Sequence, residues 1–322
     1  MHALVTGGAG FIGSHLTERL LRDRHTVTVL LKPGESMDNV KSLNVRAIYC
    51  DILDKDGLVQ AFSGANIIYH LAARTDLEGT SLADYEVNTL GTENVVAAAE
   101  INNASRLVFY SSMLAVPLTG TLDPIDESFD AKPTTIYGQS KREGERIVAR
   151  AKLPWTVIRP TLVFGPRELS TMRAFFRAVK SRHFMLIGSD VWQSFVYVKN
   201  LVEATYLASL HPEAQGEIFF VSDERPYSLA EFANSAANAL GVRLNQTRLP
   251  KLLAMLVAHL LNSVKMLFDV EVPLTPSRVG TMTSHYVYSI DKAARVFGYC
   301  PPYNLEQSMG ETATWYCDNH LL

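Results

Sequence analysis

Short apolar runs alternate with segments of helical periodicity along the first half of the chain, and short polar turns separate them. The apolar runs predict buried strands at residues 3–5, 25–31, 45–50, 66–73 and 107–110. Apolar positions at helical spacing predict helices at residues 14–21 and 85–101. Strands and helices that alternate through short connections are typical of a doubly wound parallel sheet, so we expect an α/β protein.

Three glycines follow the first predicted strand with the spacing Gly7-x-x-Gly10-x-x-Gly13 and lead into the first helix. A backbone without side chains can approach a pyrophosphate closely, and the start of a helix offers unpaired N–H groups and a positive dipole end. Gly7 would form the tight turn, Gly10 the close approach and Gly13 the packing of helix on strand. An ordinary strand-to-helix turn is the alternative, but the position directly after the first strand favours a dinucleotide cofactor.

Other candidate cofactor contacts stand where predicted strands end, because ligands of such sheets bind at the carboxyl ends of the strands. Lys32 follows the second strand, and a lysine suits a ribose 2′-phosphate better than a 2′-hydroxyl. We therefore favour NADP over NAD, with a solvated lysine as the alternative. Asp51 could accept from the adenine amino group while Ile52 packs on the ring, or the aspartate could cap the next helix. The small Ala72 and Ala73 would let the cofactor lie against backbone.

A candidate catalytic group follows the fifth strand. Tyr137 and Lys141 are four residues apart in a helix predicted at residues 137–150, so they share one face. An ammonium beside a phenol favours the phenolate, and we expect it to lower the pKa of Tyr137 from about 10. Such a tyrosine can exchange a proton with an alcohol oxygen at neutral pH, and Ser112 at the mouth of the fifth strand can hydrogen-bond the same oxygen. An exposed pair on an ordinary amphipathic helix is the alternative.

These motifs together resemble the extended short-chain dehydrogenases/reductases over essentially the whole chain. The matching segments, in the order of the family, are Thr6-Gly-Gly-Ala-Gly-Phe-Ile-Gly13, His70-Leu-Ala-Ala73, Asn88, Ser111-Ser112, Tyr137-x-x-x-Lys141 and Arg159-Pro160. The resemblance implies a Rossmann fold, with Tyr137 as general acid/base and Ser112 holding the substrate oxygen. It implies that Lys141 binds the nicotinamide ribose while tuning Tyr137, and that Asn88 is a structural or relay residue. The expected cofactor contacts are Gly7, Gly10, Phe11, Ile12, Gly13, Lys32, Asp51, Ile52, Leu71, Ala72, Ala73, Asn88, Ser111, Tyr137, Lys141, Pro160 and Val163.

The second half of the chain is less regular. A strand is predicted at residues 155–160, then a helix at 173–181, a strand at 194–200 with a helix to 210, and a strand at 216–222. Ser228-Leu-Ala-Glu231 is a capping box that begins a helix to residue 240. We therefore expect a dinucleotide-binding domain at residues 1–160, to which residues 193–212 return. Residues 161–322 would form mainly a smaller substrate-binding lobe.

Two branches of the family compete for the substrate. Sugar-nucleotide epimerases and dehydratases bind a diphosphate, for which arginine is the natural ligand, but Gln193-Ser194 stands where they usually carry Arg-Asp. Residues 278–281 partly resemble their second arginine site. The segments 195–200, 226–232 and 274–299 are instead similar to 3β-hydroxysteroid and sterol-carboxylate dehydrogenases, whereas residues 112–116 resemble plant-type ketone and acyl-CoA reductases.

The sequence therefore predicts an NAD(P)-dependent dehydrogenase or reductase. It would transfer hydride between the nicotinamide and a secondary alcohol or ketone on a bulky, largely apolar small-molecule substrate. The main alternative is a redox-neutral NDP-sugar 4-epimerase or dehydratase with tightly bound NAD. A protein that binds the cofactor without catalysis is a second alternative.

Composition narrows the partners further. The net charge is −3 and no basic tract occurs, so nucleic acid is not an expected ligand. Three cysteines without metal-ligand spacing predict neither disulfides nor a metal site, and with no signal peptide visible they favour the cytoplasm. The apolar residues 252–268 are interrupted by polar ones and fall short of the ~20 needed to cross a bilayer. They could line a pocket, touch a membrane surface or pack in the core. The family resemblance implies a homodimer through the helices at 85–101 and 137–150.

Overall fold

A seven-stranded parallel sheet forms the larger part of the protein. The computed structural model describes residues 1–244, 247–268 and 274–322. In spatial order the strands are β11 (Glu217–Val221), β6 (Trp155–Pro160), β5 (Arg106–Tyr110), β4 (Ile67–His70), β1 (His2–Thr6), β2 (Thr26–Leu31) and β3 (Arg46–Tyr49). Every neighbouring pair is parallel. The strand order reverses between β1 and β4, and this switch is where open α/β sheets bind their ligands.

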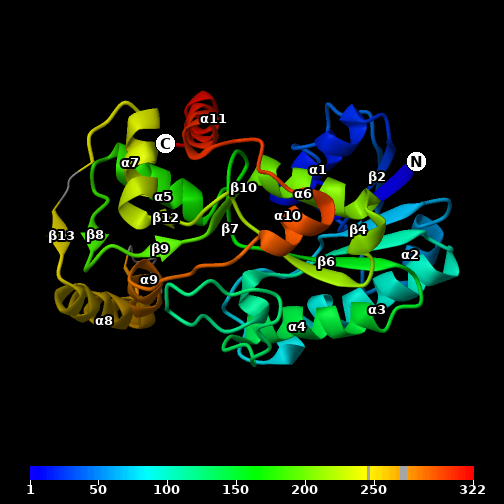
Figure 1. Ribbon diagram of the computed structural model, residues 1–322, viewed down its shortest axis with the longest axis horizontal. Helices are drawn as coiled ribbons and strands as arrows, with labels where there is room; N and C mark the ends of the chain where they lie inside the picture. Colours follow the sequence, from blue (N-terminus) through cyan, green and yellow to red (C-terminus); the bar gives the residue numbers. More distant parts are fainter. Residues whose placement is uncertain (245–246, 269–273) are drawn as a thin grey trace.

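Helices cover both faces of this sheet (Figure 1). On one face lie α1 (Phe11–Arg22), α6 (Val198–Leu210) and α10 (Asp291–Phe297), which share a hydrophobic core with Ala3 and Val5. On the other face lie α2 (Lys55–Ala61), α3 (Glu86–Ile101) and α4 (Ile136–Ala149), packed with Leu4 and its neighbours. Alternate residues of β1 thus belong to opposite cores, which explains why its centre, Ala3 to Val5, is continuously apolar. The predicted doubly wound α/β fold is confirmed.

The sequence-based interpretation gave no bounds for α2 and considered only Asp51 as a possible cap for it. The helix has seven residues and contains Gly57, so it offers too few apolar positions for a helical period. Its N-cap is Asp54, whose Oδ1 accepts a hydrogen bond from the Gly57 N–H at 3.0 Å. Asp51 does not cap this helix, because its Oδ1 accepts from the Leu53 N–H instead.

The remaining elements form a smaller lobe, on the left in Figure 1. Its short strands pair as β7 (Leu162–Phe164) with β10 (Phe195–Tyr197), β9 (Trp192–Gln193) with β12 (Tyr227–Ser228), and β8 (Leu186–Ile187) with β13 (Arg248–Leu249). Its helices are α5 (Thr171–Lys180), α7 (Leu229–Ala239), α8 (Lys251–Phe268), α9 (Pro276–Met282) and α11 (Leu305–Asp318). Aromatic side chains dominate its core, where the rings of Phe195 and Phe232 stack at 3.8 Å.

Ser228 caps α7 by accepting from the Glu231 N–H at 3.0 Å. The carboxylate of Glu231 pairs with Arg225, so the structure gives only the serine half of the predicted capping box.

More of the second half of the chain packs on the main sheet than the expected residues 193–212. The strand β11 lies beyond that range and pairs with β6 along the edge of the main sheet. The helix α10 then covers β11, with the rings of Phe219 and Phe297 at 4.9 Å. Among the residues that the structure describes, no helix combines the length and apolarity that a bilayer crossing requires.

Candidate active site

The glycine turn between β1 and α1 has the geometry expected of a pyrophosphate cradle. Gly7 has a φ of +65°. Its carbonyl oxygen accepts from the Gly10 N–H at 3.1 Å, and its own N–H donates to the Leu30 carbonyl oxygen at 3.0 Å. A Cβ on Gly13 would lie 2.1 Å from the carbonyl oxygen of Gly7, so only glycine lets the helix start this close. The N-cap of α1 is Gly10, and no side chain caps its first turn. These N–H groups fit the negative charge of a phosphate.

The end of β4 lies directly beside this turn. The Thr6 hydroxyl oxygen accepts from the backbone N–H groups of Leu71 and Ala72, each at 3.1 Å. It also contacts Nδ1 of the buried His70 at 2.8 Å. A Cβ on Gly7 would lie 3.1 Å from the Ala72 nitrogen. The two segments predicted to contact the cofactor, Gly7–Gly13 and Leu71–Ala73, therefore lie side by side at the switch point of the sheet.

The residues predicted to bind the adenosine end lie on the same edge of the sheet. Lys32 is exposed at the end of β2, and its backbone N–H donates to Glu35 Oε2 at 2.9 Å. Asp51 is half-buried after β3. Ile52 is buried in the core, where a Cβ on Gly91 would lie 2.7 Å from its Cδ1. The carboxylate of Glu35 beside Lys32 is a feature that the sequence interpretation missed.

Tyr137 and Ser112 meet where α4 approaches the end of β5. Thr135 caps α4 by accepting from the Gly138 N–H at 3.0 Å, which places Tyr137 in the first turn. A Cβ on Gly138 would lie 2.1 Å from the Leu114 carbonyl oxygen, so glycine permits the close approach. The side chain of Ser112 hydrogen-bonds Tyr137 and also accepts from the Leu114 N–H at 3.1 Å.

The pKa of Tyr137 differs from the expectation. Burial raises it to about 12, and the hydrogen bond from Ser112 offsets only part of that shift. Burial also lowers the pKa of Lys141 to about 8, against the opposing charge of Glu145. The expected acidification of Tyr137 by Lys141 does not hold, because desolvation of the phenol dominates its pKa and Lys141 is not among the groups that shift it. The ammonium nitrogen of Lys141 lies 5.0 Å from the ring centre of Phe109.

A buried ion pair joins β6 to α4, the helix that carries Tyr137 and Lys141. Arg159 is 1% exposed and donates through Nε and Nη2 to the two carboxylate oxygens of Glu145, at 2.7 and 2.8 Å. The Ser111 hydroxyl donates a hydrogen bond to Glu145 Oε1 at 2.6 Å, so this hydroxyl points toward the ion pair of Arg159 and Glu145. Sequence reasoning noted Arg159-Pro160 but missed Glu145. The only sequence signal is that Glu145 follows Lys141 by one helical turn.

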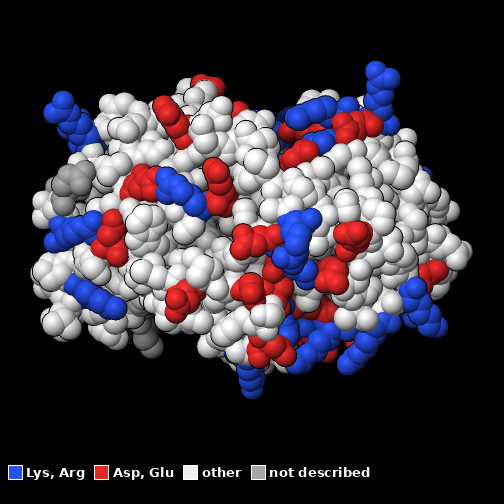
Figure 2. Space-filling view, viewed as in Figure 1, with Lys and Arg blue, Asp and Glu red and all other residues white. Residues whose placement is uncertain are grey.

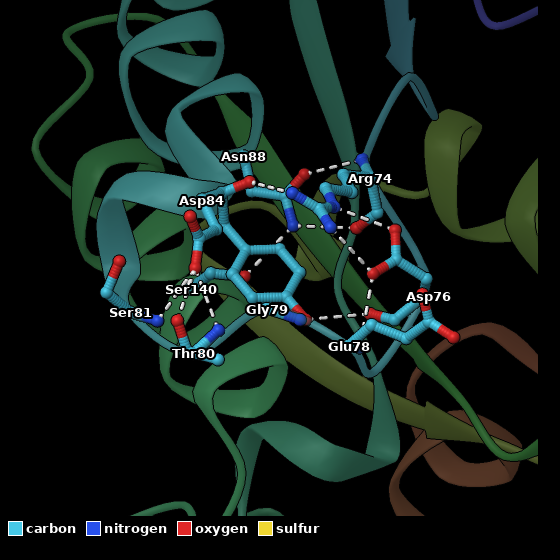
Figure 3. Close-up of polar contacts among 10 residues, drawn as sticks. Arg74, Asp76, Glu78, Gly79, Thr80, Ser81, Asp84, Asn88 and Ser140 are labelled. Atoms are coloured by element: carbon cyan, nitrogen blue, oxygen red, sulfur yellow. Dashed lines mark hydrogen bonds and ion pairs between the residues drawn. The ribbon is translucent and has the colours of Figure 1, made fainter. Parts of the chain in front are cut away.

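Asn88 joins α4 to the loop after β4 (Figure 3). Its side-chain oxygen accepts from the Arg74 N–H at 2.8 Å, and its Nδ2 donates to the Arg74 carbonyl and to Ser140 Oγ, both at 2.9 Å. Ser140 in turn donates to the carbonyl oxygen of Tyr137 at 2.7 Å. Two of the three contacts of Asn88 hold the backbone of Arg74, and the third reaches the side chain of Ser140.

The loop of residues 74–84 ends in Tyr85, a site residue without a sequence signal. Tyr85 is completely buried, and its hydroxyl donates to the Asp76 carbonyl at 2.8 Å. The loop is closed by Arg74, which pairs with Asp76 and stacks over the Tyr85 ring at 5.2 Å. The contacts of Arg74 with Asp76 are drawn in Figure 3. The Tyr85 ring contacts that of Tyr137, so the loop is connected to the catalytic candidate through this ring contact.

An apolar cluster begins directly after Ser112. It contains Met113, Val116, Ile125, Phe220, Tyr286 and Tyr288, with Leu114, Leu118, Phe129 and Leu162 packed against it. Gln193, at the position of the missing diphosphate arginine, is buried and donates to the carbonyl oxygens of Thr281 and Ser284 at 2.8 and 3.1 Å. The other predicted residues near this end are Pro160, which is buried, and Val163, which is half-buried in β7. No group of acidic, histidine or cysteine side chains suited to a metal occurs among the described residues.

Comparison with known proteins gives a family match and many relatives. Residues 4–251 match the model of the 3-beta hydroxysteroid dehydrogenase/isomerase family. The chain is 29% identical to the 3beta-hydroxysteroid-dehydrogenase/decarboxylase isoform 2 of Arabidopsis thaliana, over 96% of this chain and 61% of that protein. It is 26% identical to the decarboxylating sterol-4-alpha-carboxylate 3-dehydrogenase of Mus musculus, over 96% of this chain and 89% of that protein. A UDP-glucose 4-epimerase of Thermus thermophilus in complex with NAD shares the fold, with a TM-score of 0.77, 24% identity and coverage of 98% and 99%.

Proposed function

Because the chain belongs to the 3-beta hydroxysteroid dehydrogenase/isomerase family, and so is an NAD(P)-dependent enzyme of the extended short-chain dehydrogenase/reductase type, we propose a specific reaction for it. The protein transfers hydride between a nicotinamide and a secondary alcohol or ketone on a bulky, largely apolar substrate. The hydrogen-bonded pair of Ser112 and Tyr137, at the end of β5 and against an apolar cluster, carries this proposal. The sterol-directed names of both relatives support the substrate class.

The cofactor site fits a dinucleotide because the first turn of α1 has uncapped N–H groups and a glycine-bounded approach. A bound nicotinamide supplies or accepts the hydride. Gly7, Gly10 and Gly13 hold the pyrophosphate, with Phe11 and Ile12 beside them. Leu71, Ala72 and Ala73 form the opposite wall, while Lys141 binds the nicotinamide ribose and Ser111, Pro160 and Val163 lie at the nicotinamide end.

The proton comes from Tyr137 in the direction of ketone reduction. Since the pKa of this phenol is about 12, Tyr137 holds its proton at neutral pH and can donate it to a carbonyl oxygen. Ser112 donates a hydrogen bond to the same oxygen as negative charge develops there. In the reverse direction Tyr137 has to lose that proton first, so a nearby positive charge assists alcohol oxidation.

We propose NADP as the preferred cofactor. Lys32 is exposed at the end of β2, where the adenosine ribose of a dinucleotide lies in this fold. Its ammonium group suits a 2′-phosphate, while Asp51 and Ile52 contact the adenine. The nearby carboxylate of Glu35 is held on the Lys32 backbone N–H, so it repels a phosphate less than a free carboxylate would.

A sugar-nucleotide epimerase is the second candidate. The presence of Arg278 on α9 favours it, since arginine is suited to a diphosphate. Gln193 opposes it, because its side-chain amide is engaged with two backbone carbonyls and leaves no cation at that position. An epimerase returns the hydride to its substrate, so the two candidates differ in net cofactor turnover.

We further propose a cytoplasmic homodimer that associates through α3 and α4. Leu90 and Ile101 on α3 are exposed apolar residues that a partner would cover. Cys300 and Cys317 are free and exposed, which suits a reducing compartment. Size-exclusion chromatography with light scattering measures the oligomeric state directly.

The test of the reaction follows nicotinamide absorbance with sterol-like and aromatic ketones. We expect turnover by the unmodified protein and a loss of at least about 100-fold in Tyr137→Phe, the range of general acid catalysis. Tyr49→Phe, at an exposed position, is the matched control and keeps full activity. No turnover with any ketone, together with interconversion of NDP-sugars, would replace this proposal by the epimerase.

A further inference from the structure

The carboxylate of Glu145 is a negative charge that the protein holds in one place. The side chain is almost completely buried. It accepts hydrogen bonds from the Ser111 hydroxyl at 2.6 Å and from Arg159 at 2.7 and 2.8 Å, and such donors favour the ionised form of a carboxyl group. Arg142, on the same helix, adds an ion pair at 3.3 Å. The charge of Glu145 is therefore fixed inside the protein.

This charge lies one helical turn beyond a buried ammonium group. Lys141 is 4% exposed and precedes Glu145 by four residues in α4. Side chains at this spacing are neighbours on a helix, so opposite charges there attract each other. The attraction is stronger than it would be at the surface, because little water separates the two groups.

The ionisable groups closest to Lys141 leave Glu145 as its counter-charge. Burial lowers the pKa of Lys141 to about 8, and Glu145 opposes this shift. On β4, His70 interacts with the ammonium but is neutral, because burial lowers its pKa to about 3. Tyr137, one turn earlier on α4, is neutral as well, since burial raises its pKa to about 12. From β5 the ammonium meets the uncharged ring of Phe109.

The other elements that pack on α4 supply no second counter-charge among the residues that the structure describes. From α3, the uncharged Asn88 contacts α4 through Ser140. The 3₁₀ turn Leu82–Tyr85 carries Asp84, but this carboxylate is exposed and accepts from the N–H of Thr80. Without Glu145, the ammonium of Lys141 would therefore lose its proton at a lower pH.

The charges on the outer side of α4 differ from Glu145 in their exposure to water. At the lower centre of Figure 2, where Figure 1 places α4, acidic and basic side chains lie next to one another at the surface. Glu143 is a partly exposed acid of this helix and pairs with Arg146 at 3.1 Å. Water and salt screen such a pair. Glu143 is therefore a suitable control for the buried Glu145.

We propose that Glu145 is a positioning residue that keeps the Lys141 ammonium charged in its buried place and so enables Lys141 to hold the cofactor. The inference rests on the proposed function, in which Lys141 binds the nicotinamide ribose. An ammonium group donates hydrogen bonds roughly twice as strong as those of a neutral amine. Glu145 thus acts on the cofactor through Lys141, although its own carboxylate is held by Ser111 and Arg159.

The test measures the Kd for NADPH between pH 7 and pH 9.5 by the fluorescence of the nicotinamide. In the unmodified protein the Kd should rise as the pH passes the pKa of Lys141, about 8. In Glu145→Gln this rise should begin at least about one pH unit lower. The Kd of this variant at pH 7.5 should then be about fivefold higher. Near pH 9.5 the two Kd values should converge, because Lys141 is neutral in both proteins.

Three further variants identify the groups. Lys141→Met should bind NADPH weakly and without the pH dependence. Glu143→Gln removes the same charge from the outer side of the helix and should give the profile of the unmodified protein. Because Glu145→Gln leaves Arg159 buried without its partner, Glu145→Gln/Arg159→Met removes both charges and should fold more stably. Its Kd profile should match that of Glu145→Gln, since Arg159 does not itself shift the pKa of Lys141.

A purely structural role for Glu145 predicts a different result. It would leave the Kd values of Glu145→Gln and the unmodified protein apart by the same factor at every pH, and this outcome would overturn the proposal. A rise at the same pH in both proteins would do so too, as would a Kd of the unmodified protein that does not change with pH. Binding of NADPH requires no turnover. A protein with the expected profiles that reduces no ketone would therefore contradict the proposed reaction and support the role of Glu145.

Discussion

The ring of Tyr85 lies 6.1 Å from that of Tyr137, centre to centre, with the planes tilted by 55°. Tyr85 is completely buried, and its hydroxyl is bound within the loop of residues 74–84. The loop therefore positions the catalytic candidate through this ring contact. A cavity at Tyr85 would leave Tyr137 free to move away from the substrate oxygen.

Tyr85→Ala should reduce kcat by at least about tenfold, because small displacements of a catalytic group reduce rates strongly. It should also lower the free energy of unfolding by ~3–5 kcal/mol through the cavity that it creates. Tyr85→Phe retains the ring and should keep most of the activity. Steady-state kinetics and cofactor titration separate the effects, since the Kd for cofactor should stay unchanged. Equal kcat in the alanine and phenylalanine variants would contradict the positioning role.

Lys32→Asp should shift the cofactor preference from NADP towards NAD by about tenfold or more, measured as the ratio of kcat/KM values. The substitution replaces an attraction to the 2′-phosphate with a repulsion and offers the 2′-hydroxyl an acceptor. Lys41→Asp changes the same charge at an exposed position beside Asp38 and serves as the control. An unchanged ratio in the Lys32 variant would reject Lys32 as a phosphate ligand.

Arg159→Met should destabilise the protein by about 3–5 kcal/mol in urea unfolding, because it leaves the Glu145 carboxylate buried without its main partner. Arg142 also contacts this carboxylate, at 3.3 Å, and compensates in part. The double variant Arg159→Met/Glu145→Gln should lose less than the sum of the two single variants. If the losses in unfolding free energy of the two single variants simply add up in the double variant, Arg159 and Glu145 are not energetically coupled.

The buried His70 should make the protein less stable as the pH falls below about 6.5. Burial lowers its pKa to about 3, so the unfolded chain takes up a proton at a pH where the folded protein does not. The free energy of unfolding should therefore fall by up to about 1.4 kcal/mol per pH unit between pH 6.5 and 5 on account of this group. His70→Gln should flatten that slope in urea titrations, whereas His183→Gln at an exposed position should leave it unchanged.

Sequence patterns predicted the sheet well because most of its strands are buried on both faces and have apolar centres, with the edge strand β3 as the exception. The glycine turn could also be recognised, since Gly7 has a positive φ and Gly13 leaves no room for a Cβ. The bounds of the short helix α2 could not be predicted, because its seven residues include a glycine. The strand at residues 216–222 was predicted, but its place in the main sheet was not. An apolar strand has the same sequence pattern whether it belongs to the main sheet or to the lobe.

The electrostatics of the site could not be predicted from spacing. The four-residue interval between Tyr137 and Lys141 shows which side chains are neighbours, but not how far each is removed from water. Burial reverses the expected direction for Tyr137. Glu145 and Tyr85 were missed for a related reason, since their partners Arg159 and Tyr137 lie on other elements.

The neighbours β6 and β11 are joined only through a long excursion into the lobe. During synthesis β6 leaves the ribosome first, with its outer row of N–H and carbonyl groups unpaired until β11 follows. An uncapped strand edge can recruit other chains, so a nascent polypeptide that stalls within residues 161–216 is prone to aggregate. The arrival of β11 after this excursion is thus what closes the edge of the sheet.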